Sequence, residues 1–271
     1  MTDGRILAIG DVHGCDAALK LLLERVAPSP DDTVVILGDV VDKGPDSRGA
    51  TARLLALRER CRLIYIRGNH EHALLQALDR RARGVERWQG FEQHETFESY
   101  GGPDAIPPEH VAFWESSINY WETETEIFVH AAIESDLPLD EQFREGVRFQ
   151  YLTARHAPHY SGKRVVCGHT IQNSGDPLVL DGWVCLDTAA FRSRWLTCLD
   201  VKKHEIYQAS ADGRFQVLPL PAPPGARPPA ERRGPVPIVA PVPDVARDVL
   251  LFAALFTLGL TVALVALAFF R

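Results

Sequence analysis

The sequence has few cysteines and no excess of positive charge. Its 271 residues include five cysteines, an odd number, and no two of them have the CxxC spacing of a redox or metal-binding motif. This pattern argues against a disulfide framework and indicates a reducing compartment. The formal net charge is −7, whereas proteins that bind nucleic acids usually carry a basic surface. We therefore expect no nucleic-acid partner.

The first residues lack the features of a secretory leader. The stretch MTDGRILAIGDVHG has no basic segment followed by a long apolar core, so we expect no signal peptide. The composition, 46% hydrophobic and 24% charged residues, is that of an ordinary globular protein. The length allows one or two domains, and we expect one folded domain over residues 1–218.

Residues 219–248 are rich in proline and have almost no periodic apolar pattern. Proline fixes φ and removes a hydrogen-bond donor, so this stretch is expected to be an extended, semi-rigid linker. An ordered surface loop is the alternative. Structureless segments of this length are uncommon inside a compact domain, which favours the linker.

Residues 249–270 contain no charged side chain. As a helix they would be about 33 Å long, against about 30 Å of bilayer hydrocarbon. A buried helix of that length would normally show a polar face, so the pattern predicts a transmembrane helix. Arg227, Arg232, Arg233 and Arg247 precede it and only Arg271 follows, which favours a cytoplasmic location for the large domain. We expect a membrane protein with a single-pass C-terminal tail anchor.

Three strand–loop–helix units open the chain. The apolar runs at 5–9, 33–37 and 62–66 are typical of buried strands, and 16–26 and 47–60 have helical spacing. This alternation predicts a parallel α/β sheet, in which ligands gather at the carboxyl ends of the strands. Further strands are expected at 126–131, 164–169, 183–188, 194–200 and 204–209, the last three as an antiparallel meander.

Residues 84–125 differ from the rest of the domain because they are aromatic and are interrupted by GGP and IPPEH. We expect irregular helices here, packed over the site as a lid-like insert that shapes substrate access.

Polar, metal-capable side chains follow five of the expected strands. Each has a simpler explanation: aspartate beside glycine forms turns, asparagine caps helices, and lone histidines are often core residues. These explanations would have to hold independently at five strand ends. The residues are Asp11, His13, Asp39, Asp42, Asn69, His70, His130 and His169.

This mixture of carboxylate, imidazole and amide groups suits Mn²⁺, Fe or Zn²⁺ and suits Ca²⁺ poorly. The residues are too many for one ion. Two ions about 3.5–4 Å apart, bridged by a carboxylate, serve phosphatases and nucleases. The sequence therefore predicts a centre for two divalent metal ions, with Mn²⁺ as the first choice.

Five blocks in order carry a resemblance to a known family: GDVHG (10–14), GDVVDKG (38–44), RGNHE (67–71), VHA (129–131) and GHT (168–170). They resemble the signature of the calcineurin-like metallophosphoesterases, and their order and spacing are similar to those of the bacterial and phage branch of the PPP-type serine/threonine phosphatases. The resemblance covers about residues 5–210. It implies an α/β/β/α fold, a β-sandwich of two mixed sheets flanked by helices.

The resemblance also implies a role for each residue. His70 would be the general acid that protonates the leaving oxygen, and Asp42 would orient it and tune its charge. The two ions would make a bridging water nucleophilic near neutral pH, so no nucleophilic serine or cysteine is needed. Asp11 and His13 would bind the first ion, Asp39 would bridge both, and Asn69, His130 and His169 would complete the second.

Two departures from the family pattern concern phosphate binding. Lys43 stands where the family has an arginine, which keeps the charge but loses the bidentate geometry. A second phosphate-binding arginine is expected before the GHT block, and Arg155 is the candidate. Arg67 is expected to support the fold instead, and Glu71 and His72 are interpreted as helix residues without a catalytic role.

The resemblance implies a phosphomonoester hydrolase, and we expect a serine/threonine phosphoprotein phosphatase. A hydrolase of dinucleoside polyphosphates or other nucleotides on the same scaffold is the alternative. Asp42 favours the first, because the nucleotide branch often lacks that aspartate, and Lys43 counts weakly against it. A membrane-tethered scaffold with an inactive site would require missing ligands, and none is missing. The expected partners are the substrate and the membrane, with no obligate protein partner.

Overall fold

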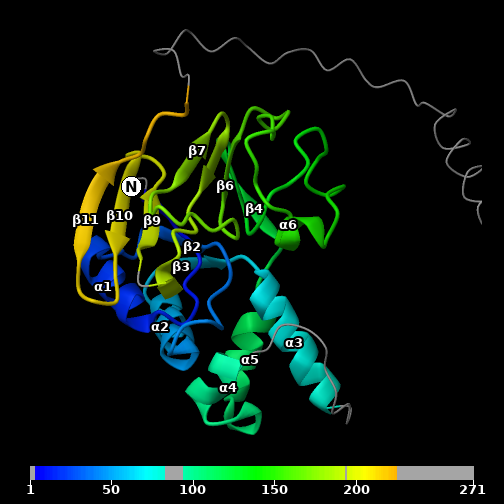
Figure 1. The fold of residues 1–271 in the computed structure, drawn as a ribbon, viewed down its shortest axis with the longest axis vertical. Helices are drawn as coiled ribbons and strands as arrows, with labels where there is room; N and C mark the ends of the chain where they lie inside the picture. The colour runs from blue at the N-terminus through cyan, green and yellow to red at the C-terminus, as the bar shows by residue number, and fades with distance from the viewer. Residues whose placement is uncertain (1–3, 83–93, 193, 225–271) are drawn as a thin grey trace, which may run out of the picture. The chain divides into compact units, whose positions relative to one another are not determined.

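Two mixed β-sheets form the centre of the protein in the computed structural model, which describes residues 4–82, 94–192 and 194–224 (Figure 1). The first sheet has six strands in the order β11-β10-β9-β1-β2-β3, and the second has five in the order β4-β5-β6-β8-β7. The strands of the first sheet are β1 (Ile6–Ile9), β2 (Thr33–Ile36), β3 (Arg62–Tyr65), β9 (Leu196–Asp200), β10 (Glu205–Ala209) and β11 (Phe215–Pro219). Those of the second are β4 (Tyr120–Glu122), β5 (Glu126–Val129), β6 (Arg164–Cys167), β7 (Leu178–Leu180) and β8 (Trp183–Cys185).

The three opening strands pair in parallel, as their apolar runs predict. Ile9 lies opposite Ile36, and Ile36 lies opposite Tyr65. Both faces of β1 are buried, because Leu7 and Ile9 pack on the helical side while Ala8 packs between the sheets. A strand buried on both faces reads as a continuous apolar run, which is why these strands are easy to find in the sequence.

Helices α1 (Asp16–Val26) and α2 (Ser47–Arg58) connect the parallel strands and cover the outer face of the first sheet (Figure 1). Leu19, Leu22 and Leu54 bury their side chains in the cluster that joins these helices to the sheet. A second cluster, with Val35 and Phe128 among its members, fills the space between the two sheets. The outer face of the second sheet is covered by residues 131–160, which contain only the one-turn helix α6 (Gly146–Phe149).

The region between α3 (Asn69–Ala82) and β4 contains α4 (His94–Tyr100), the 3₁₀ turn η1 (Pro103–Ala105) and α5 (Pro108–Glu115). Aromatic residues here are core residues: Phe113 stacks on Tyr65 with ring centroids 4.7 Å apart, and the buried Trp114 indole donates to Thr51. Part of the expected insert, residues 84–93, lies outside the described residues. A lid function for the region 84–125 stays a prediction.

The expected meander of 183–188, 194–200 and 204–209 is wrong in one respect. Strand β8 belongs to the second sheet, where it pairs with β6 and β7, while β9 and β10 belong to the first. The chain therefore crosses between the sheets after Cys185, through a segment that includes the 3₁₀ turn η2 (Ala190–Arg192). The meander of the first sheet is β9-β10-β11, and β1 pairs antiparallel with its first strand.

The predicted membrane helix requires a correction. Within residues 4–82, 94–192 and 194–224, no helix is long and apolar enough to span a bilayer. The predicted span at 249–270 lies outside the described residues, as does most of the linker at 219–248. An uncharged run is a compositional sign only, whereas spanning requires a helix that satisfies its own backbone groups. We therefore correct the fold class to a mixed α/β fold of two sheets, in which the described residues contain no helix able to span a membrane, and the membrane localisation that depended on this helix is withdrawn.

Candidate metal centre

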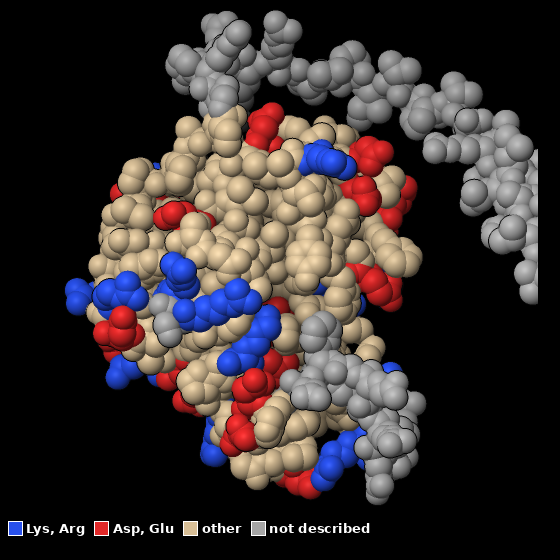
Figure 2. All heavy atoms as spheres, viewed as in Figure 1, with Lys and Arg blue, Asp and Glu red and all other residues tan. Residues whose placement is uncertain are grey.

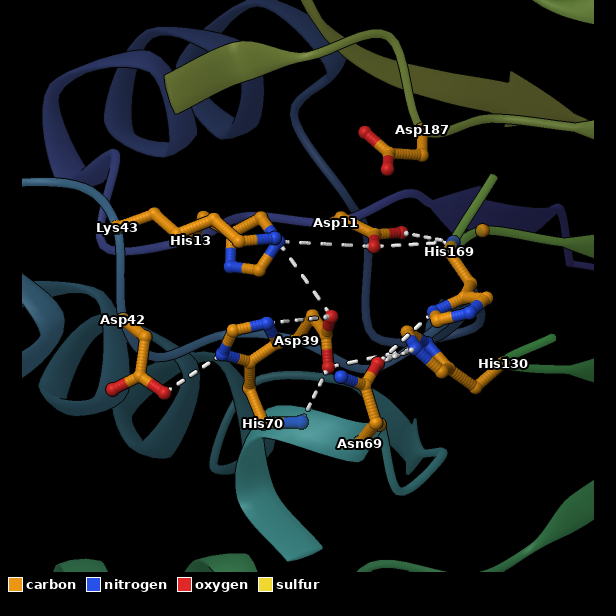
Figure 3. Close-up of polar contacts among 12 residues, drawn as sticks. Asp11, His13, Asp39, Asp42, Lys43, Asn69, His70, His130, His169 and Asp187 are labelled. Carbon is orange, nitrogen blue, oxygen red and sulfur yellow. Dashed lines mark hydrogen bonds and ion pairs between the residues drawn. The ribbon is translucent and has the colours of Figure 1, made fainter. Parts of the chain in front are cut away.

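The eight predicted site residues lie together although they come from five loops (Figure 3). Asp11 and His13 follow β1, and the loop after β2 carries Asp39 and Asp42. Asn69 and His70 begin α3 directly after β3, and His130 and His169 follow β5 and β6 of the second sheet. The site therefore lies where the carboxyl ends of parallel strands from both sheets meet. Seven of the residues are buried, and His169 is partly exposed.

The backbone at the site is strained. His13, Asp39, Asp42, Lys43 and His169 have φ between 45° and 66°, the left-handed region. Non-glycine residues rarely adopt this conformation, and those that do cluster at functional sites. The turns thus hold the side chains in place at a cost that the surrounding hydrogen bonds must offset.

Two glycines of the motifs lie so close to carboxylates of the site that no larger residue fits. A Cβ on Gly68 would lie 2.1 Å from Asp39 Oδ1, and a Cβ on Gly168 would lie 2.0 Å from Asp11 Oδ1. Any larger residue at either position would displace a carboxylate of the site.

Glu71, interpreted from the sequence as a helix residue without a catalytic role, organises the loop that carries Asp39. Its buried carboxylate accepts hydrogen bonds from the amides of Asp39 (2.8 Å), Val40 (2.7 Å) and Gly68 (3.0 Å). Burial and the nearby charge of Asp39 raise the pKa of Glu71 to about 7. Its position in the RGNHE block was the only signal in the sequence, and helical spacing alone does not distinguish it from a surface residue.

We expect Glu71→Gln to lower the free energy of unfolding by about 3 kcal/mol, because an amide NH₂ would then face backbone N–H groups. Urea unfolding of the metal-free protein measures the effect. Glu24→Gln, on an exposed position of α1, is the matched control and should change stability by less than about 0.5 kcal/mol. A loss equal to that of the control would contradict the positioning role.

One group of potential ligands surrounds His13 and Asp39. His13 Nε2 lies 3.6 Å from Asp39 Oδ2 and 4.0 Å from Asp11 Oδ2. The ligand atoms of His13, Asp39 and His70 lie within 4.8 Å of one another, close enough to hold one ion. His70 thus enters this group geometrically, in addition to the predicted Asp11.

A second group shares Asp39 with the first. The ligand atoms of Asp39, His130 and His169 also lie within 4.8 Å of one another, and His130 Nε2 is 3.5 Å from Asp39 Oδ1. Asn69 Oδ1 lies 3.0 Å from both His130 Nε2 and His169 Nδ1. Figure 3 shows Asp39 between the two groups, with one oxygen toward each.

The histidine tautomers test whether these atoms suit a cation. His13 Nδ1 donates to the Val41 carbonyl (2.9 Å), and His130 Nδ1 donates to the Leu37 carbonyl (2.7 Å). His169 donates from Nε2 to the Phe149 carbonyl (3.2 Å). The other nitrogen of each ring therefore turns a lone pair toward Asp39 or Asn69. Hydrogen-bond acceptors on the histidine rings thus lie opposite the acceptor oxygens of Asp39 and Asn69. Such a set is stable only around positive charge, and the residues fit two divalent cations that share Asp39.

Three of the four site histidines have a lowered pKa, and the fourth has a raised one. Burial lowers the pKa of His13 well below its usual value, lowers that of His130, and lowers that of His169 to about 4. These rings are neutral and can act as ligands. Burial also opposes the charged form of His70, but Asp39 and the hydrogen bond to Asp42 outweigh it and raise the pKa. His70 is therefore equipped to hold a proton.

Asp42 accepts a hydrogen bond from His70 and is positioned by Thr96. His70 Nδ1 donates to Asp42 Oδ2 at 2.8 Å. The Thr96 hydroxyl of α4 donates to the other Asp42 oxygen, and the Asp42 amide donates to Thr96 Oγ1 at 2.9 Å. The region after α3 thus contributes a residue that positions Asp42, which its aromatic composition did not reveal.

The two predicted phosphate-binding residues differ in location. Lys43 lies at the site, with Nζ 2.9 Å from His13 Nε2 (Figure 3). Arg155 is exposed and lines a cavity of about 480 Å³ to which none of the eight predicted residues contributes. Arg148 was missed: it is buried and donates to Asn119 at 2.6 Å, and its Nε has no partner among the described residues. The next residue, Phe149, accepts the hydrogen bond from His169.

A sequence profile described as calcineurin-like phosphoesterase matches residues 4–179. The chain belongs to the calcineurin-like phosphoesterase family. The match includes every loop that carries a predicted ligand, so the family resemblance expected from the motif blocks is confirmed. Metallophosphoesterases bind two divalent metal ions, which agrees with the two groups of side chains that share Asp39.

Curated relatives of this phosphoesterase match over a short segment. A symmetrical bis(5'-nucleosyl)-tetraphosphatase from Paracidovorax citrulli is 44% identical over 73 residues, which is 27% of this chain and 25% of the relative. The corresponding enzyme from Pseudomonas fluorescens is 44% identical over 71 residues, or 26% of this chain and 24% of the relative. The chain thus spans about a quarter of the length of the curated relatives it matches.

A solved structure confirms the fold over a larger share of the phosphoesterase. A protein described provisionally as a diadenosine tetraphosphatase has a TM-score of 0.56 at 22% identity and covers 80% of this chain and 94% of its own. At this level of identity the likeness concerns the fold alone.

Proposed function

We propose that the chain is a metal-dependent phosphomonoesterase that acts on phosphoserine or phosphothreonine in proteins. The observation that carries the proposal is the pair His70–Asp42, 2.8 Å apart, beside the carboxylate that both ligand groups share. A serine or threonine alkoxide is a poor leaving group and needs a proton. A positioned imidazole held in its protonated form supplies that proton.

The geometry supports a proposed role for each candidate ligand. We propose that Asp11 and His13 hold one ion, that Asn69, His130 and His169 hold the other, and that Asp39 bridges both. Bound divalent ions, with Mn²⁺ the first choice, would supply Lewis-acid stabilisation of the phosphoryl oxygens and lower the pKa of water. His70 Nε2 then donates a proton to the leaving oxygen while Asp42 holds Nδ1.

Basic side chains hold the substrate phosphate in this proposal. Lys43 is placed to contact a phosphoryl oxygen beside His13. Arg148 replaces Arg155 as the proposed second cation, because its guanidinium is buried next to the segment that contacts His169, whereas Arg155 lies at a separate cavity.

A dinucleoside polyphosphate hydrolase is the second candidate. The curated relatives with this activity support it, although the match covers a quarter of their length. The leaving group would then be a nucleotide phosphate, which needs less help from an acid.

Substrate preference separates the two candidates. The full chain loaded with Mn²⁺ is assayed for phosphate release from a panel of phosphoserine and phosphothreonine peptides and for hydrolysis of diadenosine tetraphosphate, with Asn69→Ala as the site-dead control. The proposal predicts a larger kcat/KM for peptides and its loss in the control. Preference for the dinucleotide would overturn the phosphoprotein assignment.

A further inference from the structure

Phe191 lies directly against the candidate metal centre. It belongs to η2, where the chain crosses between the two sheets, and its ring meets the His13 ring edge to face with centroids 5.2 Å apart. Neither the motif blocks nor the ligand groups include it. Its contact with a proposed ligand places this crossing segment beside the candidate metal centre.

Two cations lie over the Phe191 ring. Lys43 Nζ is 4.8 Å from the ring centroid and Arg192 Cζ is 5.2 Å from it. An aromatic face attracts each cation, and the buried carboxylate of Asp187 interacts electrostatically with both of them. The two cations are therefore held near one ring, where an anionic group of the substrate could contact them. Lys and Arg side chains gather near the middle of the face drawn in Figure 2.

Arg192 has N–H groups that could donate hydrogen bonds to a ligand. Its side chain is exposed, and among the described residues it donates one hydrogen bond, from an NH group to Asn173 at 2.7 Å. A guanidinium carries five N–H donors and can bind a phosphoryl group through two of them.

Lys43 would lose one contact if a metal ion bound to His13. Its ammonium donates to the His13 Nε2 lone pair at 2.9 Å, and that lone pair is the one proposed to bind an ion. Both cannot use it at once. The contact of Lys43 with the Phe191 ring does not use this lone pair, so in a loaded site Lys43 would stay beside Arg192 with its ammonium available to an anion.

The Phe191 ring lies close to the proposed acid. His70 lies with its ring centroid 4.8 Å from that of His13, and His13 lies 5.2 Å from Phe191. A leaving group that receives the proton from His70 and extends past His13 would meet Lys43 and Arg192.

We propose that Phe191 and Arg192, beside Lys43, form a leaving-group site that binds a second phosphoryl group carried by the substrate. The proposal rests on the proposed phosphoester hydrolysis. Two kinds of substrate carry such a group, a peptide phosphorylated at a neighbouring residue and a phosphoanhydride chain. Both present the same chemistry to the site, and Arg192 would determine preference for them over substrates with one phosphoryl group.

Steady-state kinetics of the Mn²⁺-loaded full chain test the site. The substrates are a singly phosphorylated peptide, the same peptide with a second phosphoserine, diadenosine tetraphosphate and p-nitrophenyl phosphate. We expect Arg192→Gln to reduce the preference for the substrates with a second phosphoryl group about tenfold, mainly through KM, because a charge-assisted bond to bound substrate is lost. Phe191→Leu should weaken the same preference by releasing both cations.

Arg214→Gln is the matched control, because Arg214 also lies over an aromatic ring, that of Trp195, but away from the site and paired with Asp212. Calorimetry with inorganic pyrophosphate and phosphate gives a readout without turnover, and pyrophosphate should lose its advantage in Arg192→Gln alone. Equal preference in wild type and Arg192→Gln, or no advantage for pyrophosphate in wild type, overturns the leaving-group site. Failure of the wild type to hydrolyse any of the four substrates instead overturns the proposed function, and the pyrophosphate comparison still decides the site.

Discussion

Replacing Asp39 by asparagine should reduce kcat for phosphoester hydrolysis about a thousandfold and should reduce the number of bound divalent ions. Asp39 is the one residue common to both ligand groups, with His13 Nε2 at 3.6 Å from one oxygen and His130 Nε2 at 3.5 Å from the other. Asparagine keeps the shape but presents an NH₂ group to one ion. Loss of the several kcal/mol that a Lewis acid contributes corresponds to about that factor in rate.

The measurement combines kcat with the metal content of the same sample. Asp140→Asn, an exposed aspartate away from the ligand groups, is the control and should match wild type. Far-UV circular dichroism shows whether the Asp39 variant is folded. If Asp39→Asn keeps two ions and more than about a tenth of the wild-type kcat, the bridging role is wrong.

The second large effect concerns the proton that His70 holds. His70→Asn should lower kcat for a phosphoserine peptide by about 10²–10⁴, the range for a general acid. Phenyl phosphate and p-nitrophenyl phosphate separate this role from metal binding. The nitrophenolate leaves without a proton, so the loss should be much smaller for it than for phenyl phosphate. An equal loss on both would indicate that His70 serves as a metal ligand instead.

The pH profile gives an independent prediction for Asp42. The pKa of His70 is raised by Asp39 and Asp42 against the effect of burial, so His70 is protonated below that raised value, and kcat should fall as the pH rises through it. Asp42→Asn removes one of the two stabilising carboxylates, so the basic limb of the profile should move to lower pH. A limb that does not move would show that another group controls it.

The parallel strands and the grouping of the candidate ligand residues could be predicted because their signals are local. A buried parallel strand is a continuous apolar run, and each such run ends in glycine followed by a metal-capable residue. The topology of these strands then brings Asp11, Asp39 and Asn69 together without further information.

Residues that position the site from distant parts of the sequence could not be predicted in the same way. Glu71 resembles any helical glutamate in sequence, yet its carboxylate is surrounded by backbone amides from two loops. Thr96 lies 54 residues from Asp42 in the chain and contacts it through α4. Phe191 reaches His13 only because the chain crosses between sheets at η2, where the sequence predicted a simple meander.

Composition alone also misled at one point. The uncharged run at 249–270 predicted a membrane anchor, and the part of the chain that the structure describes has no helix able to cross a bilayer. Arg155 was chosen from its place before the GHT block and stays a prediction, and the burial of Arg148 is the reason for proposing Arg148 in its place.

Calorimetric titration of the metal-free full chain with Mn²⁺ tests the central claim most directly, because the phosphoesterase function depends on two ions held by one shared carboxylate. We predict two ions per chain in wild type and a loss of at least one in Asp39→Asn, with the Asp140→Asn control unchanged. Binding of one ion or none by wild type, or two ions by Asp39→Asn, would contradict the account.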